Sequence, residues 1–206
     1  MKVSVIGLGY LGATHAVAMA KLDHEVIGIE PDDKKRSALE SGKLPFFEPG
    51  LDKALIDVIE KGQITFKANH DEDSRNAELH FICVGTPQKQ DSNAADTKYL
   101  FAAIESLAPY LSENAVVVGK STVPVGTAAE LKKALGEKTN FEPKLAWNPE
   151  FLREETALED SLRPDRIVIG TEDDYAEQKI REVYKPITDQ YNTPILITDI
   201  PTSELV

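Results

Sequence analysis

The sequence predicts an α/β protein with a doubly wound, mostly parallel sheet that carries helices on both faces. An apolar, β-branched run at Lys2–Ile6 leads directly into Gly7-x-Gly9-x-x-Gly12, and a helical pattern follows. A second apolar run, Val26-Ile27-Gly28-Ile29, ends in the acidic Glu30. After that, apolar runs and helical patterns alternate for most of the 206 residues. This alternation is typical of a parallel sheet covered by helices.

The individual elements are predicted from hydrophobic periodicity and from the turn residues between the runs. In the segment 51–61, for example, Leu51, Ala54, Leu55 and Val58 fall on one face of a helix. The predicted strands are Lys2–Ile6, Glu25–Glu30, Ile64–Lys67, Leu79–Val84, Ala115–Gly119, Lys144–Trp147, Arg166–Ile169 and Pro194–Ile197. The predicted helices are Leu11–Lys21, Asp33–Ser41, Leu51–Lys61, Lys98–Leu111, Thr127–Leu135, Glu154–Asp160 and Tyr175–Lys185.

The composition is that of an ordinary globular chain, with 41% hydrophobic and 28% charged residues. The net charge of −12 argues against a broad nucleic-acid-binding surface, although backbone donors can still hold an anion locally. No apolar stretch approaches the roughly 20 residues of a membrane span, and no signal peptide is recognisable. Cys83 is the only cysteine, so no intrachain disulfide can form. We therefore expect a cytoplasmic protein that binds neither nucleic acid nor membrane. The four histidines have no ligand spacing, and no metal site is predicted.

The glycine motif lies between a predicted strand and a predicted helix, which is the context of a Rossmann-like dinucleotide site. Gly7 allows the tight turn, Gly9 lets a pyrophosphate approach the backbone, and Gly12 lets the helix pack closely on the strand. The amides at the helix N-terminus then face the anion. Glu30 can accept hydrogen bonds from the adenosine ribose and would repel the 2′-phosphate of NADP, so the predicted cofactor is NAD. The alternative is a purely structural turn, which would not need the acidic residue.

The next strand-end motif is Cys83-Val84-Gly85-Thr86-Pro87. Gly85 allows a ligand to come close to the backbone, and Thr86 offers a hydroxyl. Cys83 is predicted to be a small core residue rather than a nucleophile. The polar loop 86–97 that follows is long enough to cover a bound cofactor, or it is simply a solvated surface loop.

Two further predicted strands also end in polar residues. In Lys120-Ser121-Thr122-Val123-Pro124-Val125-Gly126-Thr127, the two adjacent hydroxyls either face a ligand or cap a turn, and the final threonine is predicted to cap the next helix. In Asn148-Pro149-Glu150-Phe151-Leu152-Arg153-Glu154, a helix that begins at Glu150 would place Glu154 on the same face. Such a pair can act as proton acceptor and electrostatic partner, or it can simply complement the helix dipole.

Taken in order, these motifs resemble the UDP-glucose/GDP-mannose dehydrogenase family, specifically its NAD-binding domain. The matching motifs also include Glu48-Pro49-Gly50-Leu51 and Pro164-Asp165-Arg166-Ile167-Val168-Ile169-Gly170. The resemblance covers essentially the whole chain. It implies an NAD-binding domain over residues 1–198 and the start of the family's central connecting helix over residues 199–206. The central and C-terminal nucleotide-sugar domains would lie beyond this chain.

The resemblance also implies an activity. The family oxidises C6 of a nucleotide sugar from alcohol to acid with two NAD⁺, through an aldehyde that a cysteine captures and a thioester that is then hydrolysed. The family's catalytic cysteine would lie beyond residue 206, so this chain resembles a fragment that is inactive alone. The motifs favour UDP-glucose, oxidised to UDP-glucuronate. GDP-mannose or another nucleotide sugar is the alternative substrate, and a non-catalytic NAD-binding module is the alternative of another class. A homodimer formed through the central helix is implied for the parent enzyme.

Residue roles are carried over from the same resemblance. Thr122 matches a threonine that orients a water, Glu150 the general base, and Glu154 the carboxylate near the nicotinamide and substrate. Lys35 matches a basic contact beside the ribose. The implied cofactor-binding residues are Gly7, Gly9, Tyr10, Leu11, Gly12, Glu30, Lys35, Val84, Gly85, Thr86, Ser121, Thr122 and Glu154. The implied lining of the sugar end is Glu150, Phe151, Leu152, Arg153 and Glu154. This chain departs from the family in two places: Glu30 replaces the commoner aspartate, and Glu155 stands where glycine often follows.

Overall fold

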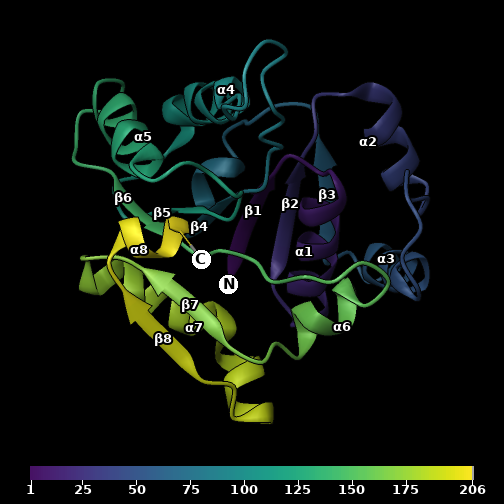
Figure 1. The fold of residues 1–206 in the computed structure, drawn as a ribbon. Coiled ribbons are helices and arrows are strands. Elements are labelled where there is room, and N and C mark those ends of the chain that lie inside the picture. The colour runs from purple at the N-terminus through teal and green to yellow at the C-terminus, as the bar shows by residue number, and fades with distance from the viewer. Residues whose placement is uncertain (206) are drawn as a thin grey trace.

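The computed structural model describes residues 1–205 and is built on one eight-stranded sheet (Figure 1). The strands are β1 (Lys2–Ile6), β2 (Glu25–Ile29), β3 (Ile64–Lys67), β4 (Leu79–Ile82), β5 (Val116–Gly119), β6 (Lys144–Trp147), β7 (Ile167–Gly170) and β8 (Ile195–Thr198). The α-helices are α1 (Tyr10–Lys21), α2 (Asp33–Glu40), α3 (Leu51–Glu60), α4 (Lys98–Leu107), α5 (Thr127–Gly136), α6 (Ala157–Leu162), α7 (Asp174–Tyr191) and α8 (Ile200–Leu205). Two 3₁₀ turns, η1 (Ser74–Asn76) and η2 (Ala108–Tyr110), complete the set.

The strand order is β3-β2-β1-β4-β5-β6-β7-β8, and the first six strands in this order pair in parallel. This confirms the predicted doubly wound, mostly parallel sheet. The last two strands run the other way. β7 meets β6 antiparallel at a single pair, Trp147 opposite Gly170, and β8 then pairs with β7 in parallel. Because β7 meets β6 only at that pair, β7 begins beyond the carboxyl edge of the parallel strands.

The register brings the carboxyl ends of the central strands level with one another. Ile6 lies opposite both Ile29 and Ile82, and Gly119 lies opposite both Ile82 and Trp147. The segments that follow these residues therefore share one edge of the sheet. In open α/β sheets, this edge is where ligands bind.

Two apolar cores cover the two faces of the sheet. On one face, α1, α3 and α7 pack against the alternating side chains of the strands, such as Val3, Val5 and Phe81. On the other face, α4 and α5 pack on residues such as Ile82 and Trp147, and these two helices lie at the top of Figure 1. Strands that are buried on both faces explain why their sequences read as continuous apolar runs.

Several details differ from the prediction. Helix α4 ends at Leu107 rather than at Leu111, and the 3₁₀ turn η2 follows it. Helix α7 does not end at Lys185 but continues through Pro186 to Tyr191. A proline inside a helix removes one hydrogen bond, and it is tolerated here because Val183 and Ile187 on either side of it are fully buried. Helix α6 begins at Ala157 rather than at Glu154.

A further difference is the cap of α5. Thr127 is not the cap but the first helical residue, and Gly126 precedes it with φ of 95°. The chain needs a left-handed residue at this point, and glycine adopts that conformation without steric cost. The Thr127 hydroxyl instead donates to the carbonyl of Pro124.

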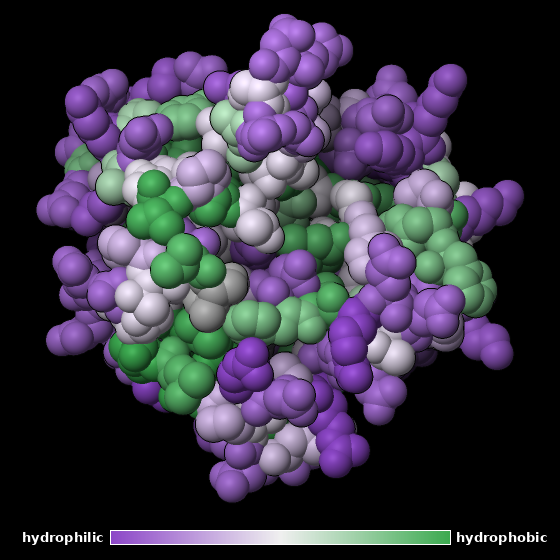
Figure 2. Space-filling view, in the orientation of Figure 1, coloured by the Kyte–Doolittle hydropathy of each residue, from purple (hydrophilic) through white to green (hydrophobic). Residues whose placement is uncertain are grey.

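Apolar side chains are exposed at several places on the surface (Figure 2). Leu196, Ile197 and Leu205 are exposed on β8 and α8. Apolar surface gathers on the side of the molecule where these two elements lie, on the left in Figure 1 and in Figure 2. The loop 86–97 projects beyond α4 in Figure 1, and most of its residues are exposed. Within residues 1–205, no helix is both long and apolar enough to cross a membrane.

Candidate cofactor and substrate site

Each of the three motif glycines is needed for a different physical reason. A Cβ on Gly12 would lie 1.8 Å from the carbonyl oxygen of Gly7, so α1 could not pack where it does. Gly7 has φ of +86°, and a Cβ there would lie 2.7 Å from a methyl group of Val84. A Cβ on Gly9, in contrast, meets no atom of the described residues within 4 Å. The fold therefore requires Gly7 and Gly12, whereas Gly9 leaves an open space at the sheet edge.

That open space faces the N-terminus of α1. Gly9 is the N-cap residue, and because it has no side chain it leaves the first amides of the helix open. The positive end of the helix dipole lies at the same point. This arrangement fits a pyrophosphate, and a side chain at Gly9 would fill its place.

Glu30 lies beside this turn and is only 5% exposed. Its Oε2 accepts a hydrogen bond from the amide of Leu8 at 3.1 Å, and its Oε1 accepts one from the amide of Asp32 at 3.1 Å. The carboxylate is thus held at the end of β2, where the prediction requires an acceptor for a ribose. Lys35 is exposed in the first turn of α2, and its contact with a cofactor stays a prediction.

The turns after β4 and β5 are tied together by two hydroxyls. Ser121 Oγ donates to the carbonyl of Val84 at 2.6 Å, and Thr86 Oγ1 donates to the carbonyl of Thr122 at 2.7 Å. These two side chains hold the turns in place. Gly85 and Thr122 are exposed between them, so the structure brings the predicted groups together at the edge.

The segment after β6 is not the helix that the sequence predicted. Residues 150–153 form neither helix nor strand, a turn follows at 154–156, and the helix begins later. Glu150 Oε2 accepts from the amide of Leu152 at 2.6 Å, which holds the chain out of the helical path. Glu155 adopts φ of 69°, a left-handed conformation that favours glycine, at the position where the family often has that residue. We call residues 150–156 the substrate loop.

As a consequence, Glu150 and Glu154 do not share a helix face. Glu150 lines a cleft of about 280 Å³. Burial lowers the pKa of Lys120 beneath this cleft, and the negative charge of Glu150 opposes part of that lowering. Glu154 is exposed and contributes to the raised pKa of Tyr10, at the start of α1. One carboxylate therefore lines the cleft, whereas the other is exposed outside it, near Tyr10.

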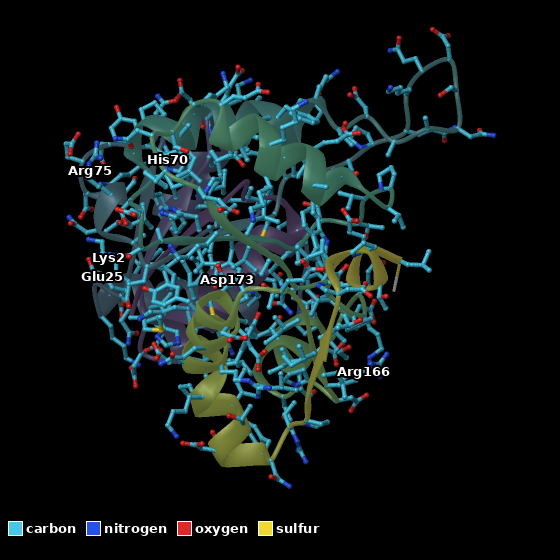
Figure 3. All side chains as sticks on the ribbon, turned by 90° about the vertical axis from the view of Figure 1, so that its left-hand side faces the viewer. Lys2, Glu25, His70, Arg75, Arg166 and Asp173 are labelled. Atoms are coloured by element: carbon cyan, nitrogen blue, oxygen red, sulfur yellow. The ribbon has the colours of Figure 1, made fainter. Side chains whose placement is uncertain are left out.

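The remaining residues of the substrate loop line the same cleft. Phe151, Leu152 and Arg153 form one side, and Arg166, from the segment before β7, stacks its guanidinium 4.6 Å from the centre of the Phe151 ring. Arg166 is labelled in Figure 3, where it lies at the side of the molecule below α8. The Arg153 guanidinium donates two hydrogen bonds to Asp160, at 2.6 and 3.1 Å, so its charge is already partnered.

A buried polar network under the cleft was not predicted. Lys120 Nζ donates to the backbone and side-chain oxygens of Asn148 at 3.2 and 3.0 Å, and the Tyr184 hydroxyl donates to the same side-chain oxygen at 2.6 Å. Asn148 in turn donates to the carbonyl of Val168 at 2.8 Å. Burial lowers the pKa of Lys120 to about 8 and raises that of Tyr184. A lysine directly after an apolar strand was the only available signal in the sequence.

Cys83 lies close to this network, but it is not equipped for chemistry. It is 5% exposed, and burial raises the pKa of its thiol to about 12. A protonated thiol is a poor nucleophile. The prediction that Cys83 is a core residue is confirmed. Among residues 1–205, no group of three or more His, Cys, Asp or Glu side chains could hold a metal ion.

Known proteins of one family match this chain. The family model for the NAD-binding domain of the UDP-glucose/GDP-mannose dehydrogenases matches residues 1–188. The chain belongs to this family. Its resemblance to the family, read from the motifs, is thereby confirmed, and its cofactor is NAD. When bound, NAD⁺ supplies a hydride acceptor, and the open space at Gly9 and the carboxylate of Glu30 fit it.

Relatives and solved structures of the family match the whole chain. It is 40% identical to the UDP-glucose 6-dehydrogenase of Rhizobium meliloti (strain 1021), over all of this chain and 48% of that protein. The structure of a UDP-glucose dehydrogenase from Pyrobaculum islandicum superposes with a TM-score of 0.91 at 37% identity, over 99% of this chain and 47% of the other. A GDP-mannose dehydrogenase from Pseudomonas aeruginosa gives 0.92 at 29% identity, over 100% and 48%. The chain thus spans about half the length of the relatives it matches.

Proposed function

We propose that this chain is the NAD-binding part of a nucleotide-sugar 6-dehydrogenase that oxidises UDP-glucose to UDP-glucuronate. The conversion of the C6 alcohol to an acid removes four electrons and consumes one water, so two NAD⁺ are reduced. The observation that carries the proposal is the placement of Glu150 in a cleft directly beside the cofactor turn. The name UDP-glucose 6-dehydrogenase, which relatives at 36 to 40% identity bear, supports UDP-glucose as the substrate.

In this proposal, the cofactor side and the sugar side of the carboxyl edge of the sheet have different roles. The amides after Gly9 and the carboxylate of Glu30 bind and orient the cofactor. Glu150 takes a proton from the water that hydrolyses the thioester, and Thr122 orients that water. Glu154 lies between the nicotinamide and the sugar, and the backbone of the substrate loop lines the sugar end.

The covalent step needs a cysteine outside these 206 residues, because the Cys83 thiol is buried and protonated. We propose that the nucleophile belongs to a following domain and that residues 199–206 open the central helix that leads to it. A homodimer formed through that helix is part of the same proposal. The chain alone is then expected to bind NAD⁺ without turning over UDP-glucose.

The test uses a protein that contains this chain together with its following domains. Glu150→Gln should leave both hydride transfers and slow the hydrolysis, because the attacking water lacks its base. Stopped-flow absorbance should show a burst of NADH followed by a slow steady rate, and mass spectrometry should show a covalent sugar adduct. Glu159→Gln, an exposed glutamate on α6, is the matched control. Wild-type turnover, or loss of the burst, would remove Glu150 from the hydrolytic step.

The second candidate substrate is GDP-mannose, since a GDP-mannose dehydrogenase has the same fold with a TM-score of 0.92. Steady-state kinetics with both nucleotide sugars would separate the two, and a higher kcat/KM for GDP-mannose would overturn the choice of UDP-glucose. A non-catalytic NAD-binding module is the remaining alternative. It would show cofactor binding without sugar oxidation in every protein that contains the chain.

A further inference from the structure

Glu48 is a buried carboxylate to which neither the motifs nor the proposed reaction gives a role. It lies in the segment between α2 and α3 and is only 3% exposed. A buried carboxylate is costly unless several donors surround it. Here the donors come from two other segments of the chain, and both belong to the candidate site.

The first donor comes from the cofactor side. The Tyr10 hydroxyl donates to Glu48 Oε2 at 2.6 Å, and Phe46 packs edge-on against the Tyr10 ring with centroids 4.9 Å apart. Burial and the neighbouring carboxylate raise the pKa of Tyr10 to about 12, so the hydroxyl stays protonated and keeps donating. Tyr10 is the first residue of α1, directly after Gly9, where the pyrophosphate is expected.

The other donors come from the substrate side. The amide of Glu155 donates to the same Oε2 at 3.1 Å, and the amide of Leu158 donates to Oε1 at 3.4 Å. Glu155 is the residue with the left-handed backbone, a conformation that persists only where surrounding contacts hold it. The hydrogen bond to Glu48 is such a contact. One carboxylate thus joins the start of the cofactor helix to the end of the substrate loop.

We propose that Glu48 is a positioning residue that couples occupation of the cofactor site to the order of the substrate loop. A pyrophosphate bound to the α1 amides fixes the backbone of Tyr10. This also restricts the Tyr10 hydroxyl, from which Glu48 accepts a hydrogen bond. The entropy cost of holding Glu155 in place is then lower once the cofactor is bound. By linkage, an ordered loop strengthens cofactor binding by the same factor. The inference rests on the proposed function only in treating residues 150–156 as the substrate loop.

The test is amide hydrogen exchange of the 206-residue chain, with and without saturating NAD⁺. In the wild type, NAD⁺ should slow exchange both at residues 7–13 and at residues 152–158, the latter about threefold or more. Glu48→Ala should keep the slowing at residues 7–13 and lose it at residues 152–158. Glu60→Ala, an exposed glutamate at the end of α3, should behave as the wild type. A purely structural role would change the exchange of the loop equally with and without NAD⁺.

Two milder variants keep the inference testable if Glu48→Ala does not fold. Tyr10→Phe removes only the hydroxyl and should reduce the NAD⁺-dependent slowing of the loop. Glu48→Gln retains one acceptor oxygen and should restore part of the slowing. The inference is overturned if NAD⁺ slows the loop equally in the wild type and in the Glu48 and Tyr10 variants, or if it does not slow the loop in the wild type. Neither outcome depends on sugar oxidation, so failure of the proposed reaction is a separate result.

Discussion

Gly9→Val should separate the cofactor function of the glycine turn from its role in folding. Gly9 has φ of −70° and ψ of −164°, which any residue adopts, and its Cβ would meet no described atom within 4 Å. Valine is a poorer N-cap than glycine, but the substitution also restricts the unfolded chain, so the free energy of unfolding should change by only about 1 kcal/mol. For a chain of this size, that is a shift of about 2–4 °C in the melting temperature.

Binding should respond far more strongly. The branched side chain would occupy the space in which the pyrophosphate approaches the helix amides, and we expect NAD⁺ affinity to fall at least about 100-fold, or about 2.8 kcal/mol. Gly12→Ala provides the contrast, because its Cβ would lie 1.8 Å from the Gly7 carbonyl oxygen. Two packed backbones would have to separate, at a cost of about 3 kcal/mol or more in stability.

The assay combines titration calorimetry with NAD⁺ and thermal unfolding followed by circular dichroism. Gly9→Val with a melting temperature within about 4 °C of the wild type and no measurable NAD⁺ binding would support the reasoning. Unchanged NAD⁺ affinity would show that the turn has only a structural role and that the cofactor lies elsewhere. A large loss of stability in Gly9→Val would instead contradict the space that the structure shows around Gly9.

Three further outcomes are expected. NAD⁺ should bind at least about tenfold more tightly than NADP⁺ in calorimetry, because the Glu30 carboxylate repels a 2′-phosphate. Glu30→Gln should reduce this preference for NAD⁺. Equal or tighter NADP⁺ binding by the wild type would refute the role of Glu30 at the ribose. Acid should destabilise the chain between about pH 6.5 and pH 4, because burial lowers the pKa of His70 to about 4 and of His80 to about 3, so the unfolded chain binds more protons there. At pH 5 each buried ring should have lowered the free energy of unfolding by about 2 kcal/mol relative to neutral pH. In urea titrations across this pH range, the free energy of unfolding of His70→Leu should therefore fall less steeply with acid than that of the wild type. Lys120→Met should lower the free energy of unfolding by about 2 kcal/mol, because it leaves the Asn148 oxygens with fewer donors and a buried group that loses its partner costs about 1–3 kcal/mol. A change of less than about 0.5 kcal/mol in the same urea titration would contradict a stabilising role of the network.

The acid prediction follows from how the two histidines are placed. His70 is labelled in Figure 3 and is 4% exposed, and within residues 1–205 neither of its ring nitrogens has a hydrogen-bond partner. His80 is completely buried and shares one nitrogen with the hydroxyl of Ser4 at 2.7 Å. A proton added to either ring would place a charge in a buried position, and the nearby carboxylate of Asp71 offsets only part of the effect of burial on the pKa of His70.

Much of the fold could be predicted because its determinants are local. The strands, the helices between them and the glycine turn each depend on a few neighbouring residues, and all eight strands lie within one or two residues of their predicted ends. The reversal of β7 could not be predicted, because an apolar run carries no information about strand direction. It depends on the pairing of Gly170 with Trp147.

The part of the site that follows the strand ends was predictable for the same reason. The residues of the turns at the sheet edge follow strand ends, and parallel strands bring those ends together. The network of Lys120, Asn148 and Tyr184 joins residues 28 and 36 positions apart, and no local pattern predicts it. The late start of α6 has the same origin, since the Glu155 amide bonds to Glu48, which lies 107 positions earlier in the chain.

The substrate loop does not maintain its own conformation, and this has a consequence for how the site tolerates change. It contains no helix or strand, and its left-handed residue and its Arg153 are held by Glu48 and Asp160, which lie outside it. Gly7 and Gly12, in contrast, are fixed by the packing of the sheet itself. Substitutions in the segment 44–49 should therefore alter the order of the substrate loop while leaving the sheet and the glycine turn intact. The cofactor half of the site is built into the packing of the sheet, and the substrate half is assembled from segments that lie far apart in the sequence.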